Sequence, residues 1–190
     1  MHETKLKTGR FLLKSPVEED DFDEITEIKS DPKVYLTQLY GKITSREYCR
    51  FMFQHYITDA KISPVRRKRW VFGIYPIETS SEFPKQKYIG NVGISKNSLS
   101  SETAHLFFEV SPNYWGLGVA TECISKVKEF AFEQGIKRIV ADPIHGNEAS
   151  KKVLTKLGFH DTGRSVPAYT GSLKHVYVFP KPKAAEKFNK

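Results

Sequence analysis

The chain has 190 residues, of which 39% are hydrophobic and 13% aromatic, and its formal net charge is +8. This length and composition suffice for one domain with a buried core, and they exclude an intrinsically disordered chain. The positive charge favours anionic partners, but it does not choose among nucleic acid, an acidic membrane surface and phosphorylated small molecules.

The cysteines and the apolar segments predict a protein of a reducing compartment. Cys49 and Cys123 lie far apart and match neither a disulfide framework nor a metal-binding spacing. The sequence has no apolar run of about 18 residues, and its first residues lack the apolar core of a signal peptide. We therefore expect no metal, no membrane contact and a cytoplasmic location, with the nucleus as the alternative.

The N-terminal part predicts one strand and two helices. Residues 9–15 form a short apolar run that is typical of a strand. Ser15 and Pro16, followed by acidic residues, are typical of a helix start, and Pro32 predicts the end of that helix. Residues 44–60 carry an aromatic and apolar stripe at helical spacing, which we expect in the core or in the wall of a cleft.

The remaining chain alternates strands and helices. Strands are predicted over residues 70–76, 87–95, 104–110, 136–142, 159–165 and 173–179, and helices over residues 117–134 and 147–158. No repeat or linker interrupts this order. We therefore expect a single α/β domain around a mixed sheet over residues 1–180, followed by a loose basic tail over residues 181–190.

The turn before the helix at 117–134 contains Gly116 and Gly118. Glycine lets the backbone approach a ligand closely, and the first N–H groups of a helix have no intrahelical partner. The helix dipole adds partial positive charge, so this turn favours an anion such as a diphosphate. The expected set is Gly116, Leu117, Gly118, Val119 and Ala120, through their N–H groups, together with Thr121. Taken alone, two glycines at a helix start are more often only a turn.

A second turn from strand to helix follows at residues 146–159. Asn147 can cap this helix, and Ser150 lies one turn further on. Two successive units of this kind create a cleft between the ends of their strands. The dinucleotide fingerprint is absent, because Thr121 or Glu122 stands where its third glycine would be, and no phosphate-loop Lys-Ser/Thr pair occurs.

Together the two segments resemble the GNAT superfamily of acetyl-CoA-dependent N-acetyltransferases. Residues 113–118 match its coenzyme motif, Gln/Arg-x-x-Gly-x-Gly/Ala, except that Asn113 stands at the Gln/Arg position. Residues 147–159 resemble the branch that acetylates protein N-termini, ribosomal proteins included, and also related small-molecule acetyltransferases. The resemblance implies a mostly antiparallel sheet, flanked by helices, in which two splayed strands hold acetyl-CoA.

The resemblance also implies how the coenzyme is held. Its pantetheine arm would pair like an added strand with the backbone of Glu109, Val110 and Ser111, and the Val110 N–H would stabilise the oxyanion. Asn147 would orient the coenzyme amide. Of Lys151, Lys152 and Lys156, one or more would reach the 3′-phosphate, and we select Lys152, although a solvated helix face is the commoner explanation for each.

The acceptor amine must lose its proton before it attacks, and three residues compete as the base. His105 lies where many relatives carry Glu, and Asp142 ends the next strand, where some relatives carry a catalytic Glu. A structural histidine and a turn-forming aspartate are the alternative explanations. Glu109 lies beside the cleft, on the opposite strand face from Phe108 and Val110, and the sequence leaves open which face is catalytic.

The group that protonates the leaving thiolate is not the tyrosine that relatives often use, because Leu154 occupies that position. Ser150 matches a serine that some relatives place near the coenzyme sulfur, although a serine inside a helix can equally bond back to the backbone. Tyr169 is a further phenol donor. No cysteine lies on the motif strands, so we expect direct transfer in a ternary complex.

The sequence leaves three alternatives for the function. A protein N-terminal α-amine is favoured by the resemblance, and a polyamine, amino sugar or antibiotic is the second choice. The third is a non-catalytic module that binds acetyl-CoA or RNA. Residues 66–69, Arg66 to Arg69, are all basic and could contact ribosomal RNA, although a solvated loop explains them more simply.

Overall fold

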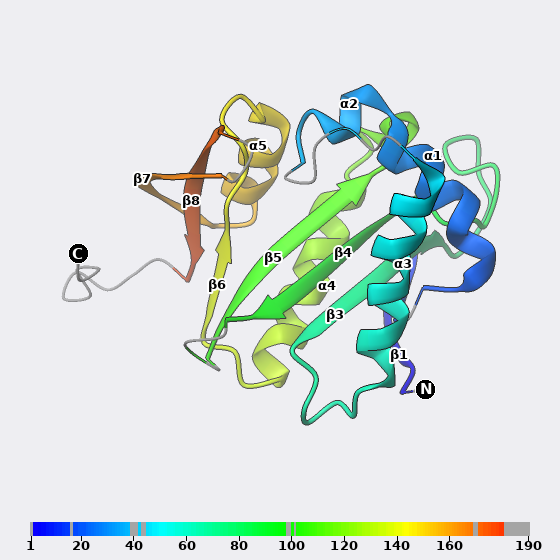
Figure 1. Ribbon diagram of the computed structural model, residues 1–190, viewed down its shortest axis with the longest axis horizontal. Helices are drawn as coiled ribbons and strands as arrows, with labels where there is room; N and C mark the ends of the chain where they lie inside the picture. Colours follow the sequence, from blue (N-terminus) through cyan, green and yellow to red (C-terminus); the bar gives the residue numbers. More distant parts are fainter. Residues whose placement is uncertain are drawn as a thin grey trace.

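The computed structural model describes residues 2–15, 17–38, 42, 45–97, 100, 102–168 and 171–180. Within these ranges, eight strands form one sheet and helices cover both of its faces (Figure 1). The strands are β1 (Thr4–Lys7), β2 (Phe11–Ser15), β3 (Arg69–Pro76), β4 (Gly90–Lys96), β5 (Thr103–Val110), β6 (Arg138–Ala141), β7 (His160–Pro167) and β8 (Leu173–Phe179). The α-helices are α1 (Phe22–Ser30), α2 (Pro32–Tyr35), α3 (Arg46–Lys61), α4 (Val119–Glu133) and α5 (Glu148–Lys156).

The strand order is β1-β2-β3-β4-β5-β6-β8-β7. Neighbouring strands are antiparallel except for β5 and β6, which run parallel and are connected through α4. The prediction of a mixed, mostly antiparallel sheet flanked by helices is therefore confirmed. The expected basic tail, residues 181–190, lies outside the described residues.

The parallel pair β5 and β6 separates soon after it forms. The two strands are in register only from Thr103 to His105, which oppose residues 138 to 140, whereas β5 continues to Val110. Figure 1 shows the strands starting side by side and diverging toward α2 and α5. Pro143, which lacks an N–H donor, follows the end of β6 closely. The expected splayed strands are thus present.

The two faces of the sheet carry separate hydrophobic layers. On one face, Leu106 and Val110 of β5 share a buried cluster with Ile124 and Val127 of α4. A second buried cluster lies on the side of α1 and α3, where Phe53 is fully buried. Because side chains alternate along a strand, the even-numbered residues of β5 face α4 and the odd-numbered ones face the other layer.

The N-terminal predictions needed two corrections. Ser15 ends β2 rather than capping a helix, and α1 begins only at Phe22, after a 3₁₀ turn that Glu18 and Asp21 close by reciprocal capping. The helix does end before Pro32, which begins α2. The sequence did not indicate β1, because this edge strand alternates charged and apolar residues over only four positions.

The aromatic stripe of α3 is divided between core and solvent. Phe53 and Cys49 are buried, whereas Tyr48 is 42% exposed and Phe51 is 60% exposed. The stripe is thus only partly a core face, as the helix has one side against the sheet and the other in water. In the described part of the chain, every helix is too short or too polar to cross a bilayer.

Candidate active site

Two glycines precede the start of α4, and neither has a side chain that could cap this end of the helix. Gly116 and Gly118 have φ values of +80° and +77°, in the left-handed region that favours glycine. Gly118 is the N-cap residue and has no side chain that could accept a hydrogen bond from the first turn. The N–H groups of this turn are therefore left for another acceptor, which is the geometry of an anion site.

A cavity of about 670 Å³ joins this helix start to the gap between β5 and β6. It is bordered by the segment that includes α2, by the end of β5, and by the first turns of α4 and α5. Its lining residues are Pro32, Lys33, Val34, Leu36, Thr37, Gln38, Phe108, Glu109, Val110, Tyr114, Trp115, Gly116, Gly118, Val119, Ala120, Thr121, Gly146, Asn147, Glu148, Ala149, Ser150, Val153 and Lys156. Most of the expected coenzyme residues are among them, whereas Ser111, Leu117 and Lys152 are not.

The backbone of β5 turns its polar groups into this gap. Ser111 donates its N–H to the Ile89 carbonyl at 2.9 Å, which extends the ladder with β4. Because N–H and C=O groups alternate sides along an antiparallel strand, Phe108 and Val110 direct theirs toward β6, which has already separated. The indole of Trp115 donates to the Val110 carbonyl at 2.7 Å.

A polar side chain from the segment after α2 also reaches β5. Gln38 donates from Nε2 to the Phe108 carbonyl at 3.4 Å. Asn147, across the gap, donates from Nδ2 to the Thr37 carbonyl at 3.4 Å. No local signal in the sequence indicates Gln38, because residues 36–38 follow no recognisable motif and only the tertiary structure brings them to the gap.

The first turn of α5 closes the gap from the other side. The Asn147 side chain accepts the Ser150 N–H at 3.1 Å, so the predicted N-cap is confirmed. A smaller cavity of about 90 Å³ lies between the two strands. Its lining residues are Thr37, Gln38, Leu106, Phe107, Phe108, Ala141, Asp142, Pro143, Ile144, Asn147, Ser150 and Leu154. Asn147 and Ser150 line both cavities and therefore lie where the two meet.

Two of the three candidate bases lie near each other on the face opposite α4. His105 Nδ1 is 3.9 Å from Asp142 Oδ1, and Asp142 also forms an ion pair with Lys174 of β8. Burial would raise the pKa of Asp142, but the neighbouring His105 imidazole, the hydrogen bond from Lys174 and the charge of that lysine hold the pKa below its ordinary value. Asp142 lines the smaller cavity, whereas His105, whose side chain is 43% exposed, is not among the residues that line either cavity.

The third candidate base, Glu109, has its carboxylate buried under α1. It lies 2.6 Å from the ammonium of Lys29 and accepts a second hydrogen bond from Asn91. Burial would lower the pKa of Lys29, but the charge of Glu109 keeps it above its ordinary value. An ionised carboxylate held by two buried donors is a structural group, so we do not assign it the role of base.

The lysines and the basic loop differ in part from expectation. Lys156, not Lys152, lines the larger cavity, as does Lys33 of α2. Arg67 is buried and donates to the carbonyls of Ala60 and Ile62 at the end of α3. Arg69 forms an ion pair with Asp59. Two of the four basic residues at 66–69 thus serve the fold, which leaves a smaller basic surface than the sequence indicated. Tyr169 lies outside the described residues.

The described residues fit a thioester carrier with a diphosphate better than a metal ion. Among them, no group of three His, Cys, Asp or Glu side chains is placed to bind a metal. A Cβ built on Gly116 would meet no atom within 4 Å, so the turn has open space beside it. The uncapped helix start can receive a diphosphate, and the free edge of β5 can receive an extended amide-containing arm.

Comparison with known proteins agrees with this geometry. A family model described as an acetyltransferase (GNAT) domain matches residues 10–160. An uncharacterized N-acetyltransferase of Schizosaccharomyces pombe is 66% identical over 176 residues, which cover 93% of this chain and 95% of the relative.

Solved structures share the fold at low sequence identity. An acetyltransferase from Salmonella typhimurium that modifies the N-terminal serine of a 50S ribosomal subunit protein superposes with a TM-score of 0.71 at 14% identity, covering 90% of this chain and 95% of its own. A spermidine N-acetyltransferase from Vibrio cholerae, in complex with CoA and spermine, gives 0.67 at 16% identity, covering 88% and 94%. Since the family model spans most of the chain and the yeast relative matches nearly all of it, the chain belongs to the GNAT family of N-acetyltransferases.

Proposed function

We propose that this protein transfers the acetyl group of acetyl-CoA to the α-amine at the N-terminus of a peptide or protein. The observation that carries the proposal is the pair of cavities that meet at Asn147 and Ser150, between the separated strands β5 and β6. Two substrates can reach one point from two directions there, as direct transfer in a ternary complex requires.

The donor side is the larger cavity. The N–H groups at Gly116, Gly118, Val119 and Ala120 would hold the diphosphate, and Thr121 borders the same turn. The backbone of Val110 would pair with the pantetheine arm. When bound, acetyl-CoA supplies the thioester carbonyl that an amine attacks. The Val110 N–H would then stabilise the negative charge that develops on the oxygen. Ser150 would pass a proton to the departing sulfur and regain one from solvent, which balances the proton that the amine loses.

The acceptor side favours a single positive charge over a polycation. Among the described residues that line the smaller cavity, Asp142 is the one carboxylate, and it shares its charge with Lys174. A polyamine carries several ammonium groups and needs several unpaired carboxylates. An α-amine has a pKa near 8 and is partly neutral at physiological pH, so it needs less help to lose its proton than a lysine amine.

We assign separate roles to the two remaining candidate bases. Asp142, held ionised, would attract and orient the acceptor ammonium beside the gap. His105 would take up its proton, directly or through a water, because a neutral imidazole has a ring nitrogen that can accept one. Cys49 and Cys123 are fully buried, and burial raises the pKa of both thiols, which supports transfer without an acyl-enzyme.

The identity of the acceptor is tested by measuring the acetylation of several candidate amines. Peptides with varied first residues, their N-terminally blocked counterparts, spermidine and amino sugars are incubated with acetyl-CoA, and thiol release is followed. We expect free N-termini to react and blocked ones not to. Acetylation of spermidine at a higher kcat/KM than any peptide would favour the second acceptor, for which the Vibrio cholerae structure with spermine is the precedent. If no acceptor in the screen caused thiol release, neither a peptide nor a small amine would be supported as the acceptor, and the result would support a non-catalytic module that only binds.

Contact with RNA would rest on Arg66 and Lys68, since Arg67 and Arg69 are engaged in the fold. We therefore leave nucleic acid out of the proposed function.

A further inference from the structure

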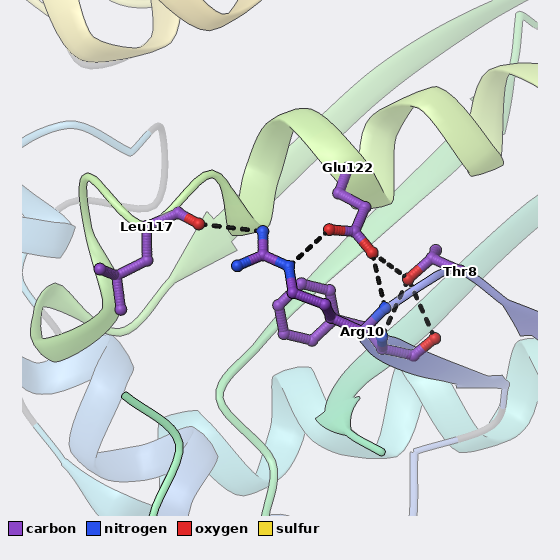
Figure 2. A network of polar contacts seen from close by, with 5 residues as sticks. Thr8, Arg10, Leu117 and Glu122 are labelled. Carbon is purple, nitrogen blue, oxygen red and sulfur yellow. Dashed lines mark hydrogen bonds and ion pairs between the residues drawn. The ribbon is translucent and has the colours of Figure 1, made fainter. Parts of the chain in front are cut away.

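The turn between β1 and β2 is fastened to the first turn of α4 by one carboxylate. Glu122 accepts hydrogen bonds from the Thr8 hydroxyl at 2.6 Å and from the Arg10 backbone N–H at 2.8 Å (Figure 2). The Arg10 side chain donates from Nε to the same carboxylate at 2.8 Å. These groups come from segments more than 100 residues apart, so the tertiary structure alone brings them together.

The guanidinium of Arg10 has a second partner in the glycine turn. Its Nη2 donates to the Leu117 carbonyl at 3.0 Å, as Figure 2 shows. The rings of Phe11 and Phe83 lie beside the guanidinium, which restricts where it can move. Arg10 thus bridges Glu122 and the Leu117–Gly118 peptide with two donors of one planar group.

This bridge determines which way the Leu117–Gly118 peptide points. A trans peptide directs its carbonyl and its N–H to opposite sides, so a carbonyl turned toward Arg10 turns the Gly118 N–H away from it. Gly116 and Gly118 line the larger cavity, whereas Leu117, between them, does not. The N–H of this peptide thus points away from Arg10, and it belongs to Gly118, which lines the cavity.

The charges of Arg10 and Glu122 are also compatible with an anion at the start of α4. Burial would raise the pKa of Glu122, but the hydrogen bonds from Thr8 and Arg10 hold it below its ordinary value, so the carboxylate is ionised. An unpaired negative charge one turn into α4 would repel a diphosphate at the helix start. Arg10 lies between that carboxylate and the turn and offsets its charge.

We infer that Arg10 is a positioning residue of the coenzyme site, which fixes the Leu117–Gly118 peptide so that the Gly118 N–H faces the bound diphosphate. This inference rests on the proposed function. It makes the N-terminal hairpin part of the coenzyme site, although its side chains are not among those that line the cavity.

The test compares Arg10→Gln with Lys7→Gln, which removes the same charge from an exposed position of the same hairpin. CoA affinity is measured by calorimetry, and kcat/KM is measured for acetyl-CoA and for S-acetylpantetheine, which lacks the diphosphate. Arg10→Gln should weaken CoA binding by at least about tenfold, as loss of a charged hydrogen bond does, and leave kcat/KM for S-acetylpantetheine nearly unchanged. Lys7→Gln should bind CoA like the unchanged chain.

Several results would overturn the inference. Unchanged CoA affinity in Arg10→Gln, an equal loss for both acetyl donors, or an equal loss in Lys7→Gln would each remove the positioning role. If Arg10→Gln does not fold, Arg10→Lys is tested instead, because an ammonium cannot donate to Glu122 and to the Leu117 carbonyl at once as the planar guanidinium does. Unchanged CoA affinity in Arg10→Lys would then overturn the inference. Failure of the unchanged chain to bind CoA would instead overturn the proposed function.

Discussion

The ammonium of Lys29 lies 2.6 Å from the carboxylate of Glu109, and the two side chains are 1% and 5% exposed. This pair joins α1 to the end of β5, the strand to which we assign the oxyanion donor. It also explains why Glu109 cannot serve as an acceptor of the substrate proton, since its charge is already matched in the interior.

Lys29→Met should destabilise the fold strongly, because it leaves the charge of Glu109 buried without its cation. We expect a loss of about 3–5 kcal/mol in the free energy of unfolding, measured by urea denaturation. The double variant Lys29→Met/Glu109→Gln should lose less than the single one. Lys5→Met, at an exposed site, serves as the control and should change stability by less than about 0.5 kcal/mol. A mild effect of Lys29→Met would contradict the importance of the pair.

Gly116→Glu should lower the affinity for acetyl-CoA by at least about tenfold, because it puts a carboxylate at the diphosphate turn. Its control is Gly135→Glu at the other end of α4. Both glycines have φ of +80° and open space beside the Cβ position, so both substitutions strain the backbone alike. Calorimetry should show that only Gly116→Glu affects binding. Equal affinities in the two folded variants would refute the location of the coenzyme.

His105→Gln and Asp142→Asn should affect different kinetic constants. Loss of the proton acceptor should reduce kcat about 100-fold, with a smaller effect on KM. Loss of the orienting carboxylate should raise KM for the peptide about tenfold, with a smaller effect on kcat. Steady-state kinetics over a pH series distinguishes them. The opposite assignment, in which Asp142 removes the proton, would be indicated by a collapse of kcat in Asp142→Asn with KM unchanged.

Ser150→Ala should lower kcat about tenfold while leaving CoA affinity and stability unchanged, because the backbone N–H of residue 150 still bonds to Asn147. Thr155→Ala, on an exposed position of the same helix, is the matched control. An undiminished kcat would show that the serine hydroxyl does not protonate the leaving group, and would return it to a structural role.

The stability contribution of Asp142 should disappear in acid. Its pKa in the folded state lies below the ordinary value of 3.8, so its ion pair contributes fully above about pH 4 and is lost as the pH falls through the folded-state value. Asp142→Asn should therefore cost about 1–3 kcal/mol at pH 7 and progressively less toward pH 3. Urea denaturation at both pH values measures this difference, and a constant cost would contradict the ionised state of Asp142.

Local sequence signals located the glycine turn and the cap of α5 correctly. Gly118 adopts the left-handed conformation that its residue type favours, and Asn147 caps α5 as its position indicated. Such features depend on a few adjacent residues and their backbone preferences. The prediction that Ser15 caps a helix was wrong because it too relied on adjacent residues alone. A serine before a proline is equally compatible with the last position of a strand that pairs with a neighbour.

The sequence by itself determined most of the strands and helices, the glycine turn at the start of α4 and the family, because these follow from periodicity, glycine placement and contiguous motifs. The tertiary structure alone decided that Glu109 is paired with Lys29, that Gln38 reaches β5 and that Arg10 holds the glycine turn. Each of these contacts joins residues 70 or more positions apart. Which distant side chains meet is determined by strand order and helix packing, which no local pattern of residues encodes.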